Sequence, residues 1–309
     1  MKFRSLISVS LFILLLCNSN CFSQEEEEKR PKKPKSAKGF HVGLFVGYYY
    51  ANKYTSNLYD GWGYDENGKR NDFTNSFMYR RIVNDYGGGN SGTTDQIAVA
   101  LGVDPTANPK QWSFDETDMP VKMKYSPALL FGLQMNYGIT KKDALVFNLS
   151  AVKINLIGSF AMVITNPIIG PQPPGYQNLK YFSITGGEQR LMLQMGYRRI
   201  LGENDFVNFF IEAGPALNYT KFIKNQITIN NLPIDLSFYY TQPYYPTYRA
   251  SYLRGTGFGA FAGFGINITA SPKWTLQFLY NPSYEKINIG QEPKPALQNS
   301  FGLRAFYNL

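Results

Sequence analysis

The chain has 309 residues, of which 44% are hydrophobic, with 23 Tyr, 23 Phe, 28 Gly and a single His. Part of its formal net charge of +9 lies in one short tail, so the charge does not outline a nucleic-acid groove and we expect no nucleic-acid partner. Both cysteines, Cys17 and Cys21, precede that tail, which excludes a disulfide scaffold or a thiolate metal site in the rest of the chain.

Residues 1–23 combine a basic start, an apolar run from Leu11 to Leu16 and small polar residues before Gln24. This pattern predicts a signal peptide that is removed on export. A rival interpretation makes Cys21 a lipid-modified N-terminus, although the residues before it do not fit the usual lipidation signal. Residues 24–38 are charged and contain proline, which predicts a disordered tail.

From Phe40 onward, apolar residues alternate with small or polar ones, which is the pattern of a barrel strand. Eight such rows occur, and they begin at Phe40, Leu129, Leu145, Leu191, Val207, Phe258, Trp274 and Phe301. No later apolar run approaches the roughly 20 residues of a membrane helix. A membrane-spanning chain of this kind must close a barrel, because lipid offers no partner to unpaired backbone groups. We therefore predict an all-β fold over residues 39–309, an eight-stranded antiparallel up-and-down transmembrane β-barrel with long structured extracellular loops.

The joins between the rows alternate in length. Brief turns lie near Lys141, Glu203 and Ser271, and long excursions follow Tyr50, Gly158, Lys221 and Asn281. Short periplasmic turns and long outer loops are typical of such barrels, so we expect both termini on the periplasmic side. The third row changes phase by one residue near Ala151, for which we expect a β-bulge.

Two outer loops are distinctive. The first, residues 51–125, is too long for an unstructured connection, and Thr93 to Gly102 has the cap, apolar face and stop of a short helix. The third, residues 222–254, is rich in tyrosine. Clustered Tyr and Arg favour recognition, which gives a candidate partner-binding set of Tyr239, Tyr240, Tyr244, Tyr245, Tyr248 and Arg249. Packing onto the first loop, a protein partner and a glycan all remain open for these rings.

An eight-stranded barrel is just wide enough for side chains to fill it, which argues against a general porin. The inward faces of the predicted strands carry polar and charged residues that we expect to form a hydrogen-bonded lumen plug. This set is Gln134, Gln194, Arg198, Glu212, Asn218 and Arg304. Buried charges must find partners, which favours a filled lumen over a narrow or gated conduit.

No catalytic constellation stands out. A lipid-modifying hydrolase or acyltransferase usually needs a His base, and His41 lies near the periplasmic end of the first strand, far from the outer leaflet. Residues 65–72 have part of a calcium-loop pattern but lack the closing Glu, and the glycine-rich residues 87–92 lack the Lys of a phosphate loop. We expect no catalytic, cofactor-binding or metal-binding residue and no cofactor.

The terminal residues from Phe301 to Leu309 resemble the last strand by which outer-membrane barrels are recognised for assembly, with Leu where Phe is usual. Together with the signal, the tail and the eight rows, most of the chain resembles the OmpA-like or PorT-like barrel domains of Bacteroidota. The resemblance is one of pattern and carries no functional residue. It implies an outer-membrane location and a non-enzymatic accessory subunit of a secretion or assembly complex.

Two other functions stay open: a narrow channel or ligand-uptake protein, and a lipid-modifying enzyme. The expected partners are outer-membrane lipid and proteins of the complex. The basic tail could contact peptidoglycan as easily as protein.

Overall fold

The computed structural model describes residues 39–65, 67–84, 92–165, 178–204, 206–237, 253–271, 273–290 and 294–308. Contacts separate Met1–Lys35 from Ser36–Leu309, and all the described residues belong to the second unit. The predicted signal peptide and tail lie outside the described residues. Within the described ranges, no helix is long and apolar enough to cross a membrane.

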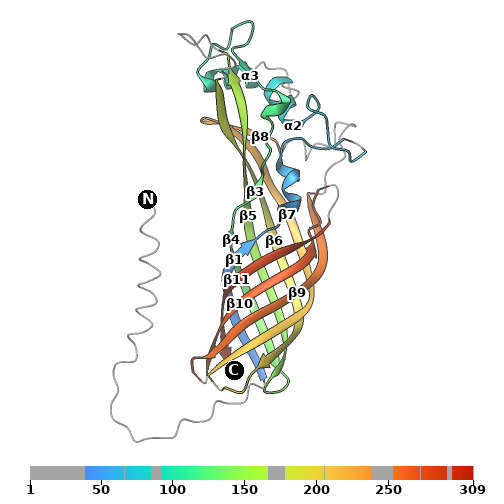
Figure 1. The fold of residues 1–309 in the computed structure, drawn as a ribbon, viewed down its shortest axis with the longest axis vertical. Coiled ribbons are helices and arrows are strands. Elements are labelled where there is room, and N and C mark those ends of the chain that lie inside the picture. Colours follow the sequence, from blue (N-terminus) through green and yellow to red (C-terminus); the bar gives the residue numbers. More distant parts are fainter. Residues whose placement is uncertain are drawn as a thin grey trace, which may run out of the picture. The chain divides into compact units, whose positions relative to one another are not determined.

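Eight long antiparallel strands form a closed ring (Figure 1). In ring order they are β1 (Gly39–Tyr50), β4 (Ala128–Gly138), β5 (Asp143–Ile164), β6 (Leu179–Leu201), β7 (Val207–Ile229), β9 (Arg254–Thr269), β10 (Trp274–Lys286) and β11 (Pro295–Asn308). The last strand pairs back with the first, from His41 opposite Asn308 to Tyr50 opposite Asn299. The ring confirms the predicted eight-stranded up-and-down barrel.

The outer face of the barrel is apolar and its interior is mixed, as alternation along each strand requires. In β1, Leu44 is 63% exposed while the next residue, Phe45, is 3% exposed. In β7, the same contrast separates Phe209 at 62% from Phe210 at 1%. An apolar surface around a hydrogen-bonded ring is the arrangement of a transmembrane barrel. Four exposed aromatic residues flank the short turns at one end, namely Tyr137, Tyr197, Phe206 and Trp274.

The expected bulge near Ala151 is absent. Strand β5 pairs with β6 residue for residue from Asp143 to Val163, without a shift of register. The apparent slip is a change of which face is apolar. Before Ala151 in the sequence, the outward residues are Leu145, Phe147 and Leu149. After Ala151, the apolar residues face inward and Lys153 faces outward. The apolar residues change face because the strand leaves the apolar band and enters a second, water-facing region whose core lies inside the wall.

Three strands of the wall, β5, β6 and β7, continue well beyond the ends of the others (Figure 1). Three short strands lie along them: β2 (Trp112–Ser113) and β3 (Lys124–Tyr125) pair with β5, and β8 (Leu232–Asp235) pairs with β7. Strand β7 therefore runs to Ile229, through a segment predicted as the start of the third loop, and β6 includes Tyr181. We call this end the long-loop end, and the opposite one the short-turn end.

The first loop folds against these extended strands. Its helices are η2 (Lys53–Tyr59), α2 (Phe77–Tyr79), η3 (Arg80–Asn84), α3 (Gly92–Leu101) and η4 (Glu116–Asp118). Helix α3 confirms the predicted helix. It ends at Gly102, whose φ of 77° suits glycine, and the amides of Gly102 and Val103 donate to the carbonyls of Val99 and Ala98. This is a Schellman termination.

A large apolar core joins the first loop to the inner face of the extended strands. It includes Tyr59, Ile97, Phe160, Ile184 and Ile227, all 2% exposed or less. We call the first loop together with the extended strands the outer module. Each of these side chains contributes about 1.5–3 kcal/mol when it is fully buried, so the module has a substantial apolar core of its own.

Candidate functional site

The barrel interior is the place where the structure concentrates buried charge. Near the short-turn end, Glu212 lies between Arg198 and Arg304, and all three are at most 2% exposed. Arg198 Nε and Nη2 donate to Glu212 Oε2 at 2.9 and 2.7 Å, and Arg304 donates to both carboxylate oxygens at 2.9 and 2.7 Å. Strands β6 and β7 place Arg198 directly opposite Glu212. One carboxylate therefore holds two guanidinium groups inside the wall.

Aromatic rings complete the surroundings of these two arginines. The Arg198 guanidinium lies 4.9 Å from the ring centre of Phe210 and 5.5 Å from that of Phe306. Arg304 lies 5.8 Å from the ring centre of Phe45. Since only one carboxylate faces two cations, ring faces offset part of the excess positive charge.

Amides occupy the middle of the lumen. Gln194 Oε1 accepts hydrogen bonds from Asn281 Nδ2 at 2.9 Å and from Asn148 Nδ2 at 3.4 Å. A cavity of about 10 Å³ lies beside them, and Gln134 and Ser300 also line it. That volume holds about one water molecule. Side chains at this height of the lumen therefore leave room for about one water molecule.

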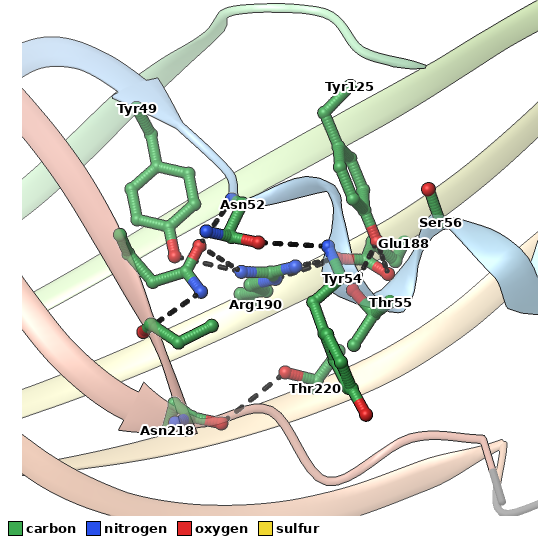
Figure 2. A network of polar contacts seen from close by, with 12 residues as sticks. Tyr49, Asn52, Tyr54, Thr55, Ser56, Tyr125, Glu188, Arg190, Asn218 and Thr220 are labelled. Carbon is green, nitrogen blue, oxygen red and sulfur yellow. Dashed lines mark hydrogen bonds and ion pairs between the residues drawn. The ribbon is translucent and has the colours of Figure 1, made fainter. Parts of the chain in front are cut away.

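A second charged network lies across the barrel at its long-loop end (Figure 2). Glu188 and Arg190, two residues apart on β6, are fully buried and form an ion pair. Arg190 Nε donates to Glu188 Oε1 at 2.7 Å, and Arg190 Nη1 donates to Tyr49 Oη at 2.9 Å and to Gln298 Oε1 at 3.2 Å. Strands β1, β6 and β11 are thereby linked across the mouth.

The same network holds the first loop in place. Tyr59 of η2 and Tyr125 of β3 each donate a hydroxyl hydrogen to Glu188 Oε2, at 3.0 and 3.1 Å. Thr55 Oγ1 lies 2.6 Å from Tyr125 Oη, and the ring of Tyr59 stacks on Phe222 at 5.4 Å. Burial, followed by the negative charge of Glu188, raises the pKa of Tyr59 well above its usual value, so the hydroxyl remains a donor.

The six predicted lumen residues all lie inside the barrel wall and are buried. Arg198, Glu212 and Arg304 come together in one cluster, while Gln134 and Gln194 line the small cavity. Asn218 belongs elsewhere: its Nδ2 donates to Glu285 Oε2 at 2.9 Å, close to the long-loop end. Their common role as a plug stays a prediction.

Sequence analysis missed Glu188, Arg190, Glu285 and Gln298. The signal was present, because Arg190 is in phase with Gln194 and Arg198 on the inward face of the same strand. The predicted outward row of this strand began at Leu191, so the inward residues before Leu191 were not included in the predicted strand. The six residues from Tyr239 to Arg249 predicted to bind a partner lie outside the described residues, and so does the glycine-rich stretch 87–92 except for Gly92.

The remaining candidates can be placed. His41 of β1 lies at the short-turn end, paired in register with Asn136 and Asn308. Asp65 caps a tight turn, accepting from the amides of Asn67 and Lys69 at 2.9 and 2.8 Å. No group of three or more potential metal ligands occurs in the part of the chain that the structure describes.

No family model matches the chain. No curated protein matches it. Similar solved structures include Neisserial surface protein A, with 8% identity, a TM-score of 0.38, and coverage of 88% of this chain and 98% of that one. The attachment invasion locus protein Ail of Yersinia pestis has 8% identity and a TM-score of 0.32, with 87% and 98% covered. The outer membrane protein OprG of Pseudomonas aeruginosa has 7% identity and a TM-score of 0.36, with 89% and 98% covered.

Proposed function

We propose that the chain is a non-enzymatic outer-membrane β-barrel that serves as a structural or accessory subunit of an outer-membrane protein complex. A complex for secretion or assembly, of the PorT-like kind in Bacteroidota, is the form suggested by the sequence pattern. In this proposal both termini are periplasmic and the outer module faces the cell exterior. The proposal is supported by the apolar band around the barrel, whose polar interior is closed.

The observation that carries the proposal is the network around Glu188 and Arg190. It joins three barrel strands to both ends of the first loop, so the outer module is fixed to the barrel mouth. A mouth closed in this way does not favour solute passage. A rigid module above a membrane anchor is suited to contact a partner protein, because little entropy is lost when its surface is bound.

The test is purification of the affinity-tagged full chain after gentle detergent extraction, under conditions that preserve known membrane complexes. We expect defined partners to co-purify. Ile184→Ala, which removes a buried side chain of the module core, should reduce their recovery while the barrel stays folded. Leu193→Ala, at a half-buried, outward-facing position on the same strand, is the matched control. Recovery of the lone barrel from both wild type and control would contradict the proposal.

A narrow channel is the second candidate, because the water-sized cavity lies between the two charged networks. The purified chain in planar bilayers decides this point. Conductance that is reproducible and changes on Glu212→Gln would favour a channel. A silent bilayer with folded protein would favour the closed anchor.

An enzyme is the third candidate and needs a general base. His41 is the residue to test, since it is the one histidine of the sequence. Under our proposal His41→Ala leaves outer-membrane lipid composition unchanged, as measured by mass spectrometry of extracted lipids. Loss of a lipid modification with intact folding would favour the enzyme.

A further inference from the structure

A row of basic side chains crosses the outer surface of the barrel along one line of cross-strand partners. The register places Lys153 of β5 opposite Gln189 of β6, Gln189 opposite Lys221 of β7, and Lys221 opposite Arg254 of β9. All four side chains are exposed and point outward. Adjacent strands are about 4.8 Å apart, so three positive charges lie within roughly 14 Å along this row.

Among the residues that the structure describes, these charges have no ion-pair partner. Lys221 and Arg254 face each other directly, and like charges in that arrangement repel and destabilise a sheet. Within the described ranges, neither side chain forms an ion pair or a hydrogen bond, and the same holds for Lys153. The outward positions immediately next to them in the strands, Ala151, Asn155 and Tyr219 among them, carry no acid. An external anion would relieve the repulsion.

A β-bulge adds a fourth cation. The pairing of β6 with β7 shifts between Gly187 and Glu188, which face Lys224 and Phe222. Without that extra residue, Lys224 would continue the inward phase of Phe222, but the bulge turns it outward and leaves it exposed. The Lys224 side chain then lies beside Gly187, where a Cβ atom would be 3.4 Å from Lys224 Cγ.

The row lies at the boundary of the apolar band. Directly below it, toward the short turns, the outward residues are Ala151, Leu191 and Tyr219. From Leu191 to Leu201, ten residues of tilted strand cover about 25 Å along the barrel axis, which is the usual height of a lipid-facing band. The basic row therefore lies where headgroups of the surrounding leaflet would lie.

The opposite boundary is different. At the short-turn end, Arg199 lies 3.5 Å from Asp143, and Lys142 lies 3.2 Å from Glu203. These two cations are paired with acids of the chain itself, whereas Lys141 and Lys273 in the same turns are exposed and form no ion pair among the described residues. What distinguishes the long-loop boundary is that Lys221 and Arg254 face each other directly in register.

We propose that Lys153, Lys221, Lys224 and Arg254, the basic row, bind the phosphate groups of lipid headgroups in the leaflet on the long-loop side. This inference rests on the membrane location in the proposed function and adds a lipid class to it. Phosphate supplies the negative charge that would neutralise the basic row. The long lysine side chains can reach the headgroups while their aliphatic parts lie on the apolar wall.

The experiment uses the full chain in nanodiscs of phosphatidylcholine, with and without phosphatidic acid, which presents a phosphate monoester. Folding is followed by the heat-dependent mobility shift of barrels in gels. The basic-row variant is Lys153→Gln, Lys221→Gln, Lys224→Gln and Arg254→Gln together. The control variant removes the same number of exposed charges elsewhere, at Lys110, Lys141, Lys180 and Lys273.

We expect phosphatidic acid to raise the unfolding temperature of the wild type and of the control variant. The basic-row variant should require about tenfold or more phosphatidic acid for the same rise, since each basic residue near a membrane surface adds to the attraction for anionic lipid. Inorganic phosphate at matched concentration should not reproduce the rise. Equal shifts in the basic-row and control variants, or full stabilisation by inorganic phosphate, would overturn the proposal.

Failure of the membrane location gives a different result. A chain that does not enter phosphatidylcholine discs in a heat-shifted form overturns that location, and the basic row with it. A chain that enters normally but responds equally in both variants overturns the basic row alone. Neither result depends on whether a protein complex is recovered.

Discussion

Strands β5, β6 and β7 run through both halves of the barrel wall, and the two halves are stabilised in opposite ways. Between the short turns and Ala151, Leu145 and Leu149 of strand β5 face outward. Inside the barrel at this end, Glu212 forms ion pairs with Arg198 and Arg304. Beyond Ala151 the strand faces outward with Lys153, and its buried residues join the apolar core of the outer module. Backbone geometry does not change between the halves, because the register is continuous. Solvent on the outside, lipid or water, decides which face carries the apolar residues.

The largest effect should come from the ionic half. Glu212→Ala removes the one carboxylate that holds Arg198 and Arg304, which leaves two buried positive charges facing each other. Breaking a buried pair of this kind costs about 3–5 kcal/mol. Urea unfolding in detergent, followed by the gel mobility shift, measures the loss. Glu203→Ala, at an exposed turn, should cost little, and an equal loss in both variants would contradict the role of the cluster.

The apolar half should respond to loss of volume instead. Ile184→Ala creates a cavity in the core of the outer module and should destabilise that module by about 2–5 kcal/mol. Limited proteolysis should then cut the first loop faster while the barrel keeps its mobility shift. If Leu193→Ala accelerated the cleavage equally, the two halves would not be separate cores.

The third prediction changes the outward face directly. Leu149→Lys places a charge in the lipid-facing band and should cost about 2–4 kcal/mol. Ser159→Lys is the matched change ten residues further along the same row, where the outward face meets water, and should be nearly neutral. Both are measured by unfolding in lipid discs. Similar costs at the two positions would show that the apolar band extends above Ala151.

The smallest effect concerns a single carboxyl in the first loop. Burial raises the pKa of Asp60 to about 6 despite Arg70, which donates to it at 2.8 Å. The folded loop therefore holds a proton that the unfolded loop loses near pH 4, so the contribution of Asp60 to stability falls as the pH rises from about 4 to 6.

Hydrogen exchange, corrected for its intrinsic pH dependence, should show residues 60–70 more protected at pH 5 than at pH 7. Asp60→Asn should remove the difference, because its side chain does not titrate. Asp72→Asn is the control at a fully exposed position in the same loop. A pH dependence that persists in Asp60→Asn would assign it to another group.

Much of the fold could be predicted because side chains of a barrel strand alternate between the outer and inner faces with a period of two residues. The outward rows at Leu44, Phe209 and Phe264 are exposed as expected, and the helix ending at Gly102 follows from its local stop signal. The bulge at Ala151 was wrong because the period was assumed to describe one environment along the whole strand. The real bulge, at Gly187, has no local signal apart from two glycines.

The candidate site was predicted in part. Glu212, Arg198 and Arg304 could be assigned to the interior from alternation, but their meeting depends on the register between β6, β7 and β11, which no single strand encodes. Glu188 and Arg190 were missed because the segment that holds them, with glycines and polar residues, does not alternate clearly. Tyr59 and Tyr125 join them from a loop, where sequence periodicity carries no information on position.

The continuous strands of the wall also have a mechanical consequence. Strands β5 and β6 pass from the lipid-facing band into the outer module along an unbroken series of backbone hydrogen bonds, and β7 does so with one bulge. A ladder of this kind resists bending and twisting, and no linker separates the module from its anchor. A force or torque applied at the tip of the outer module is therefore transmitted to the barrel, because the two move as one stiff body.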